Sequence, residues 1–186
     1  VFNGSNSVIS SEPNFRSVSI TGTASLATGA SVKVSTGFAI QGGNFSLNNA
    51  TFYTTTWAKT GTFNANTGTF IWLGTASVPV ESYYHLHIGD GSTTFATTFS
   101  ISTYNITKIL TVKMVAPDYA DAQNALIRIG GNLTIDGTTT SDNVFKPSSS
   151  SVIFNGSTTQ TIEGTAQQPF ILNNISISGT ATILSL

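Results

Sequence analysis

Hydrophobic and polar residues alternate in short runs along most of the chain, and glycine, asparagine, aspartate or clusters of serine and threonine bound each run. Alternation with a period of two over four to six residues is typical of β-strands that bury one face. Residues 117–124 differ, because a proline and two aspartates that can cap a turn predict a loop or a short helix there. The pattern predicts an all-β fold with at most one short helix. The alternating apolar positions include Val18 and Ile20, Val32 and Val34, Phe45 and Leu47, Leu110, Val112 and Met114, Leu133 and Ile135, and Ile175 and Ile177.

Internal repetition is the strongest feature of the sequence. Three segments begin with similar apolar and glycine positions and continue into an alternating run that ends at a glycine. A second motif, Ala39–Leu47, recurs 88 residues later as Ile127–Ile135. We therefore predict a single domain with repeat units at residues 1–38 (partial), 39–126 and 127–186. The three segments and their closing glycines are Val1–Gly22, Phe70–Gly89 and Val152–Gly179.

Two architectures suit many short strands with frequent turns. In a parallel β-helix, each coil of chain climbs by one strand spacing and equivalent side chains stack in ladders, so unequal insertions can leave at the corners. An antiparallel β-sandwich or jelly roll would instead need hairpins, for which Gly89–Gly91 and Asp136–Gly137 offer turns. Repetition favours the β-helix, a β-solenoid of several irregular coils.

Three motifs in residues 127–177 carry a resemblance to a known class of repeats. They are a G-N-L-T-I strand at Gly131–Ile135, an F-N-G-S-x-x-Q-T-I segment at Phe154–Ile162 and the strand Leu172–Ile177. In this order they resemble the β-solenoid repeats of large prokaryotic cell-surface and adhesin-like proteins. Residues 39–88 resemble these repeats more loosely, because Trp72-Leu73 replaces the Phe-Asn pair. The resemblance implies a right-handed parallel β-helix on a cell surface or in an extracellular fibre, and it brings no catalytic residue.

The composition replaces charge with neutral polar groups. The chain has 24 Ser, 30 Thr and 15 Asn, whereas charged residues make up 8% and the net charge is −1. So few cations leave no basic surface for a phosphate backbone, which excludes nucleic acid as a partner. An apolar fraction of 39% argues against charge-driven disorder. On stacked strands, hydroxyl and amide ladders avoid the repulsion that like charges would cause.

Missing residue types and segments narrow the possibilities further. Without cysteine there is no disulfide framework, thiolate zinc site or cysteine nucleophile. No stretch approaches the roughly 20 apolar residues that span a bilayer, so we expect no membrane span in this segment. The residues from Val1 to Gly4 also lack the charged and apolar regions of a signal peptide.

His85 and His87 are the candidate metal ligands, because they lie two residues apart in one predicted strand and share a face. Asp90 follows just beyond the strand as a possible third ligand. The chain has no further histidine, so we expect ordinary exposed strand residues and neither a metal nor a cofactor. Asp118 and Asp121 lie in the irregular segment and are better explained as turn-capping residues than as calcium ligands.

We expect the protein not to be an enzyme. Glycosidase chemistry needs two carboxylates that flank one bond, and the chain has only three glutamates and five aspartates, spread over its length. A lyase-type site would need a basic residue beside acidic ones, for which Arg128 or Lys113 near Asp118 is the one candidate. A carbohydrate-active β-helix stays open as an alternative.

Aromatic residues and asparagines suggest two kinds of carbohydrate contact. Exposed aromatic rings stack on sugars in carbohydrate recognition, and asparagine in an N-x-[ST] sequon is an acceptor for N-glycosylation where that machinery exists. The candidate stacking residues are Trp57, Trp72, Tyr83 and Tyr84, and the sequons are at Asn3, Asn44, Asn49, Asn105, Asn132, Asn155 and Asn174.

The sequence therefore favours an extracellular structural or adhesive module that serves as a stalk, spacer or filament-forming subunit. Residues 1–20 and 153–177 resemble each other, so one copy could follow another, within a longer chain or head to tail. Its expected partners are neighbouring copies or flanking repeats, joined by end-to-end β stacking, and possible surface glycans. The alternatives are a carbohydrate-binding β-helix and a pilus-type subunit assembled by strand donation.

Overall fold

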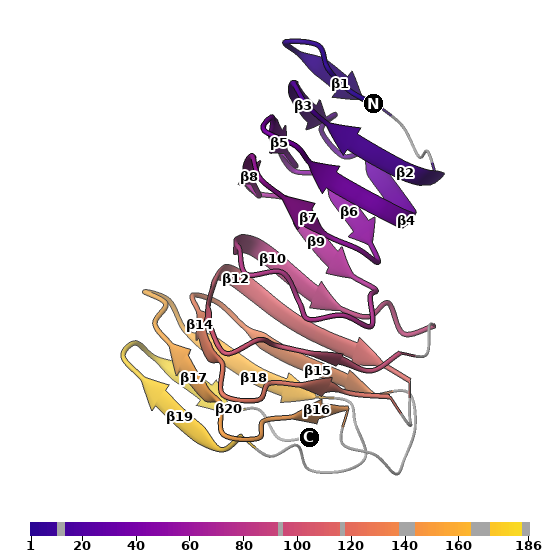
Figure 1. Ribbon diagram of the computed structural model, residues 1–186. Helices are drawn as coiled ribbons and strands as arrows, with labels where there is room; N and C mark the ends of the chain where they lie inside the picture. The colour runs from indigo at the N-terminus through magenta and orange to yellow at the C-terminus, as the bar shows by residue number, and fades with distance from the viewer. Residues whose placement is uncertain (11–13, 93–94, 116–117, 138–143, 165–171, 184–186) are drawn as a thin grey trace. The chain divides into compact units, whose positions relative to one another are not determined.

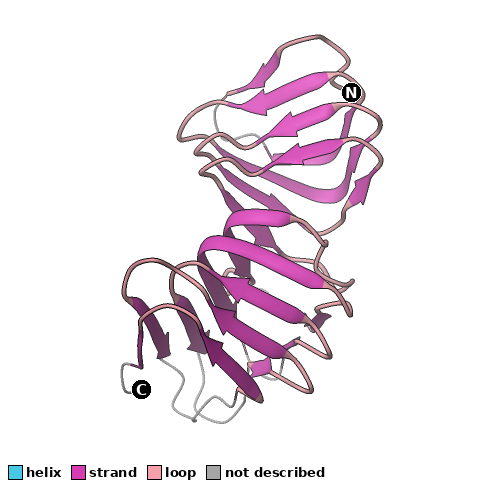
Figure 2. Cartoon of the chain, turned by 90° about the vertical axis from the view of Figure 1, so that its left-hand side faces the viewer, coloured by secondary structure: helices cyan, strands magenta, loops and turns pink. Residues whose placement is uncertain are grey.

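Parallel β-strands stacked in successive coils make up the structure. The computed structural model describes residues 1–10, 14–92, 95–115, 118–137, 144–164 and 172–183. Within these residues the chain contains only strands, turns and loops, as Figure 2 shows, and the strand pairs within residues 1–73 and within residues 74–186 are parallel. The predicted β-solenoid is confirmed. The alternative, an antiparallel sandwich or jelly roll, is not formed.

The chain divides into two compact units, Val1–Leu73 and Gly74–Leu186, which we call unit 1 and unit 2. In unit 1, β1, β3, β5 and β8 form one parallel sheet, and β2, β4, β6 and β9 lie side by side in a second (Figure 1), with β7 beside β4. The strands are β1 (Ser7–Ile9), β2 (Asn14–Ile20), β3 (Thr23–Leu26), β4 (Ser31–Ile40), β5 (Asn44–Ser46), β6 (Thr51–Thr54), β7 (Ala58–Lys59), β8 (Thr62–Asn64) and β9 (Thr69–Trp72).

Unit 2 repeats the arrangement with a longer coil. In one sheet, β10, β12, β14, β17 and β19 lie in succession. The later part of β12 pairs with β15, which begins a second succession, β15, β18 and β20, in the same sheet. A separate sheet consists of β11, β13 and β16. The strands are β10 (Ser82–Ile88), β11 (Thr97–Thr98), β12 (Thr103–Met114), β13 (Ala120–Asp121), β14 (Leu126–Ile129), β15 (Leu133–Gly137), β16 (Phe145–Lys146), β17 (Ser151–Phe154), β18 (Gln160–Gly164), β19 (Asn174–Ile177) and β20 (Ala181–Ile183).

For residues 117–124 the sequence predicts a loop or a short helix. The helix is not formed from Asp118 onward, so that part of the prediction is wrong. From Asp118 onward the described chain forms strand β13 and then a turn. Ala120 and Ala122 are fully buried, and an Oδ1 atom of Asp121 accepts a hydrogen bond of 2.8 Å from the backbone N–H of Gln123. The small alanines therefore fill a crowded position in the core, and the aspartate caps a turn rather than a helix.

The structural repeat is one coil, which is much shorter than the 88-residue offset in the sequence. In unit 1, Thr51 pairs with Thr69, whereas in unit 2 Leu110 pairs with Leu133 and Leu133 with Ile162. A coil therefore takes about 18 residues in the first case and 23 to 29 in the second. The repeat boundaries predicted at residues 39 and 127 both lie inside strands, β4 and β14.

Stacked apolar columns form the two cores. Unit 1 has an aromatic core, in which the rings of Phe38, Phe45 and Phe52 lie with centroids 4.7 to 5.2 Å apart. Unit 2 has aliphatic columns, and four successive members of one of them are at most 1% exposed. Full burial of such a side chain stabilises a fold by about 1.5 to 3 kcal/mol. The four are Leu86, Leu110, Leu133 and Ile162.

One polar side chain, Gln160, is fully buried at a corner of unit 2. Its amide nitrogen donates to the carbonyl oxygens of Ile129, at 2.8 Å, and Gly131, at 2.6 Å, and its Oε1 accepts a bond of 2.8 Å from the backbone N–H of Gly156. Gln160 thus contacts three backbone groups in two successive coils. The Gly131 carbonyl and the Gly156 N–H have their hydrogen bond from this side chain, whereas the Ile129 carbonyl also accepts one of 3.0 Å from the backbone N–H of Asn155. The glutamine of the Q-T-I motif is therefore a structural residue.

We predict that Gln160→Leu lowers the free energy of unfolding by about 2 to 4 kcal/mol, because leucine leaves the Gly131 carbonyl and the Gly156 N–H without a partner and removes one of the two hydrogen bonds to the Ile129 carbonyl. Urea unfolding followed by circular dichroism measures the change. Gln41→Leu is the matched control, since Gln41 is exposed and accepts a hydrogen bond from Ser19 Oγ at the surface. Its effect should stay within about 0.5 kcal/mol. Equal losses in the two variants would contradict the structural role of Gln160.

Candidate functional site

The predicted metal ligands His85 and His87 lie on the outward face of β10, and Leu86 and Ile88 between and beyond them are fully buried. Asp90 does not join them, because its Oδ1 accepts hydrogen bonds from the backbone N–H and the Oγ of Ser92, at 3.0 and 2.8 Å. The described residues contain no group of three or more histidine, cysteine or acidic side chains that could hold a metal ion.

The pKa values of both histidines are lowered. Burial lowers the pKa of His87 to about 4, with smaller effects from the charges of His85 and Lys113. Burial also lowers the pKa of His85 below 6.5, and the positive charge of Lys108 adds to the effect. Lys108 is therefore close enough to impose a positive field on this face of β10.

The NMR signals of His87 should titrate near pH 4. Because the unfolded chain takes up this proton near pH 6.5, the folded state should lose stability as pH falls from 6.5 towards 4. His87→Thr should flatten that dependence, since Thr111 occupies the paired position on β12. Lys113→Gln should raise the pKa of His87 by removing a repelling charge. An unchanged pKa in this variant would contradict the effect of Lys113 on His87.

Two of the four predicted sugar-stacking residues are core residues, so the prediction is wrong for them. Trp72 and Tyr83 are each 1% exposed, and the hydroxyl of Tyr83 donates to the carbonyl oxygen of Pro79 at 2.6 Å. Burial accordingly raises the pKa of Tyr83 well above its usual value. Trp57 and Tyr84 are half-buried and keep part of their rings accessible.

Trp57 lines a groove in unit 1, with a volume of about 530 Å³. Its ring stacks on Phe38, with the centroids 5.1 Å apart, and meets the rings of Phe63 and Phe70 edge-on. The hydroxyl groups of Ser17, Ser19, Thr36 and Thr56 also line the groove. An aromatic ring held rigid among hydroxyl groups is the arrangement that neutral sugars bind. We call this surface the Trp57 groove.

Acidic side chains of unit 2 are engaged separately rather than paired with one another. Asp136 forms an ion pair of 3.4 Å with Lys113, and Glu163 accepts a hydrogen bond of 3.1 Å from Thr134. Asp121 accepts one of 2.6 Å from Ser148. Glu12 and Asp142 lie outside the described residues. In these contacts each carboxylate links two neighbouring coils.

Six of the seven sequon asparagines are exposed, and Asn132 is half-buried. Asn132 Oδ1 accepts a hydrogen bond of 3.0 Å from the backbone N–H of Thr161, and Asn49 Oδ1 accepts one of 2.8 Å from Gly29. These two side chains have structural contacts. The exposed ones are Asn3, Asn44, Asn49, Asn105, Asn155 and Asn174.

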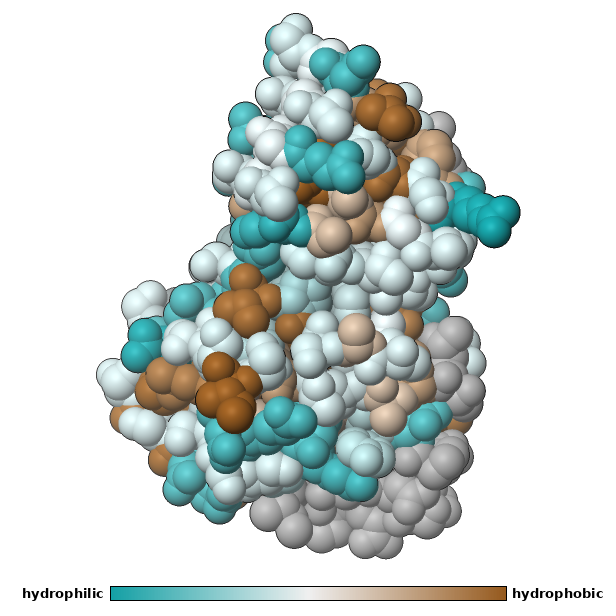
Figure 3. All heavy atoms as spheres, viewed as in Figure 1, coloured by the Kyte–Doolittle hydropathy of each residue, from teal (hydrophilic) through white to brown (hydrophobic). Residues whose placement is uncertain are grey.

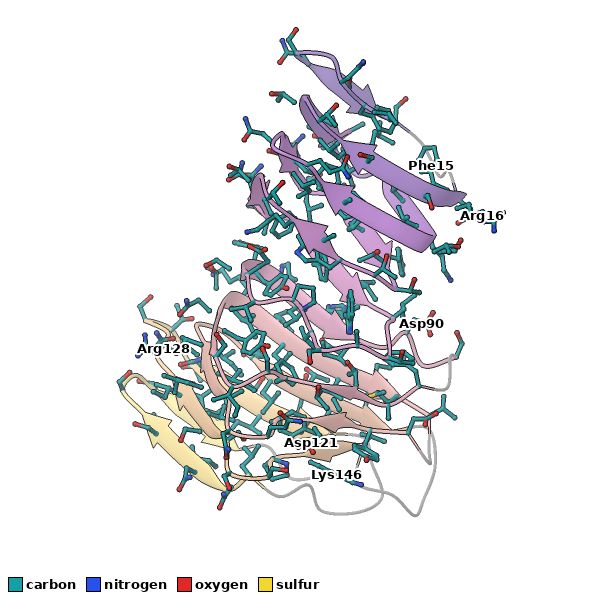
Figure 4. All side chains as sticks on the ribbon, viewed as in Figure 1. Phe15, Arg16, Asp90, Asp121, Arg128 and Lys146 are labelled. Atoms are coloured by element: carbon teal, nitrogen blue, oxygen red, sulfur yellow. The ribbon has the colours of Figure 1, made fainter. Side chains whose placement is uncertain are left out.

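A second groove, of about 430 Å³, lies in unit 2 at the corner where β12 passes from its pairing with β14 to its pairing with β15. Lys108 and Arg128 line it, and both are exposed. In Figure 4, Arg128 and Asp90 lie on opposite sides of unit 2, so this acidic residue is remote from the groove. Sequence reasoning missed the groove, because its residues come from three coils.

The edge strand β19 leaves two apolar side chains uncovered. Ile175 and Ile177 are 43% and 48% exposed. They pair in register with Val152 and Phe154 of β17, which are buried, and so occupy core positions in an outermost coil.

Comparisons with protein-family models, curated proteins and solved structures found no match for this chain. No helix in the described part of the chain is long and apolar enough to cross a membrane.

Proposed function

We propose that the protein is an extracellular structural or adhesive repeat module of a prokaryotic surface protein, in which further coils continue the solenoid as a stalk, spacer or filament. The observation that carries this proposal is the position of Ile175 and Ile177. Their partners Val152 and Phe154 are at most 1% exposed because β19 covers them. A further coil in the same register would cover the two isoleucines in the same way.

The outward face supports long stacks, because its ladders are neutral. Ser77 and Thr98 of neighbouring coils hydrogen-bond at 3.0 Å, as do the amides of Asn48 and Asn66 at 3.3 Å. Most of the surface in Figure 3 is pale, which is the colour of weakly polar residues such as serine and threonine. Repeated coils with this face accumulate little like-charge repulsion.

The position of β19 at the edge of the sheet, as far as the described residues extend, favours the same proposal. A strand edge with free N–H and C=O groups pairs readily with another strand, and proteins that stay monomeric usually block such edges. The extracellular and prokaryotic parts of the proposal rest on the resemblance of residues 127–177 to cell-surface repeats.

In solution, where no flanking coil is supplied, the β19 edge can pair only with a second copy. We therefore expect concentration-dependent self-association, measured by sedimentation velocity, with filaments visible by negative-stain microscopy. Ile175→Lys with Ile177→Lys should abolish it, because stacking would bury two charges. Ser176→Lys is the control, since Ser176 faces outward on the same strand and pairs with half-buried Ile153. A monomer at all concentrations would count against the proposal.

The Trp57 groove supports a second candidate function, the binding of neutral glycans. Trp57 is one of two tryptophans, and Trp72 is buried, so fluorescence quenching by a soluble ligand reports on Trp57. We expect neutral oligosaccharides to change the emission of the native protein. Trp57→Phe keeps an aromatic ring in the packing and should weaken their binding about tenfold, measured by isothermal titration calorimetry because the variant lacks the reporting ring. Tyr53→Phe, at a half-buried ring outside the groove, should leave binding unchanged. A glycan panel with no ligand would exclude this candidate.

A further inference from the structure

The groove beside Lys108 and Arg128 has features that coil stacking does not require. We call it the Lys108–Arg128 groove. Seven polar side chains line it, and none of them forms a hydrogen bond or ion pair with another described residue. The seven are Asn105, Thr107, Lys108, Arg128, Asn155, Ser157 and Thr158.

Glycines hollow out this corner. A Cβ atom on Gly156 would lie 2.1 Å from the carbonyl oxygen of Gly130, and one on Gly130 would lie 2.3 Å from that of Thr107. No side chain fits at either position, so successive coils approach closely there. The longer side chains on both sides of the glycines then form the walls, with Asn105, Lys108 and Arg128 from β12 and β14.

The two cations of the groove are distinct from the other cations of unit 2. Lys113 forms an ion pair with Asp136, and Lys146 lies 3.3 Å from the ring centroid of Tyr119. Figure 4 shows Lys146 close to Asp121, on the paired strand β13. Among the described residues that line the groove, none is acidic. The described lining therefore leaves its positive charge unbalanced, which favours an anion from solution.

We propose that the Lys108–Arg128 groove binds an acidic saccharide, whose carboxylate or sulfate groups contact the two cations and whose hydroxyl groups bond with the amide and hydroxyl side chains. Arginine binds a carboxylate with two parallel hydrogen bonds, and lysine adds a point charge. Asn105, Asn155, Ser157 and Thr158 supply both donors and acceptors, as sugar hydroxyl groups require. This proposal is independent of coil stacking and of the Trp57 groove.

A saccharide matches the groove better than a small inorganic anion does. A volume of about 430 Å³ exceeds what one sulfate or phosphate fills and falls within the range of small-molecule sites. The charged and neutral polar residues are also distributed over successive coils. A ligand that spans them must carry hydroxyl groups as well as negative charge.

The test uses oligogalacturonate as the probe, with its carboxyl-reduced, neutral form as the matched control ligand, in isothermal titration calorimetry at low ionic strength. We expect the acidic form to bind, added salt to weaken binding, and the neutral form to bind at least about tenfold more weakly. Lys108→Gln with Arg128→Gln should reduce affinity for the acidic form by about tenfold or more. Both residues are exposed, so folding should be retained, which circular dichroism checks.

Two further variants separate a specific site from general charge attraction. Arg16→Gln with Lys33→Gln removes the same charge outside the groove, in unit 1, and should leave the affinity unchanged. Asn155→Asp adds a negative charge within the groove at constant volume and should weaken binding. Failure of oligogalacturonate to bind, an equal loss in the Arg16 and Lys33 variant, or equally tight binding of inorganic sulfate or phosphate would each overturn the proposal.

Discussion

Register between successive coils is the constraint on which the rest of the structure depends. Parallel hydrogen bonding places each residue beside its equivalent in the next coil, so Leu86, Leu110 and Leu133 form one continuous apolar column. A slip by one residue would turn that column outward, and the core therefore specifies the pairing. The same register arranges serine, threonine and asparagine in outward ladders, and it brings Lys108 and Arg128 from different coils to one groove. Core, surface and site are thus consequences of a single alignment.

The strands were predictable because alternation is a local signal, whereas the coil length was not. Several coils share a tight turn whose first residue has a positive φ, namely 55° at Asn48, 44° at Gln123 and 44° at Ser148. Asparagine, glutamine and serine serve the same geometry at this position, so no single residue type marks the coil. Tyr83 shows a second limit of prediction from the sequence. A register shift between Tyr83 and His85 breaks the alternation, so that Tyr83 faces the core while His85 and His87 face outward.

The two grooves occupy comparable corners of their units. In unit 1 the pairing of β2 with β4 shifts between Phe15 and Ser17, and the Trp57 groove lies beside that shift. In unit 2 the shift between β10 and β12 lies beside the Lys108–Arg128 groove. Where a strand bends at a corner, consecutive side chains point outward and leave a hollow between coils. The fold therefore supplies a repeated recess, and the residues around it give each recess its own chemistry, aromatic in one unit and cationic in the other.

The glycine corner has a consequence for how such a protein changes length. Gly130, Gly156 and Gly179 follow one another in successive coils, and a Cβ atom on each of the last two would lie 2.1 Å from the carbonyl oxygen of the glycine before it. Duplicating or deleting a whole coil brings another glycine to the same place and preserves every contact. Inserting a single residue at the corner would put a side chain where none fits. Changes of length by a whole coil therefore keep the glycine stack, whereas single-residue insertions at this corner break it, so the length of the solenoid can vary while the corner is preserved.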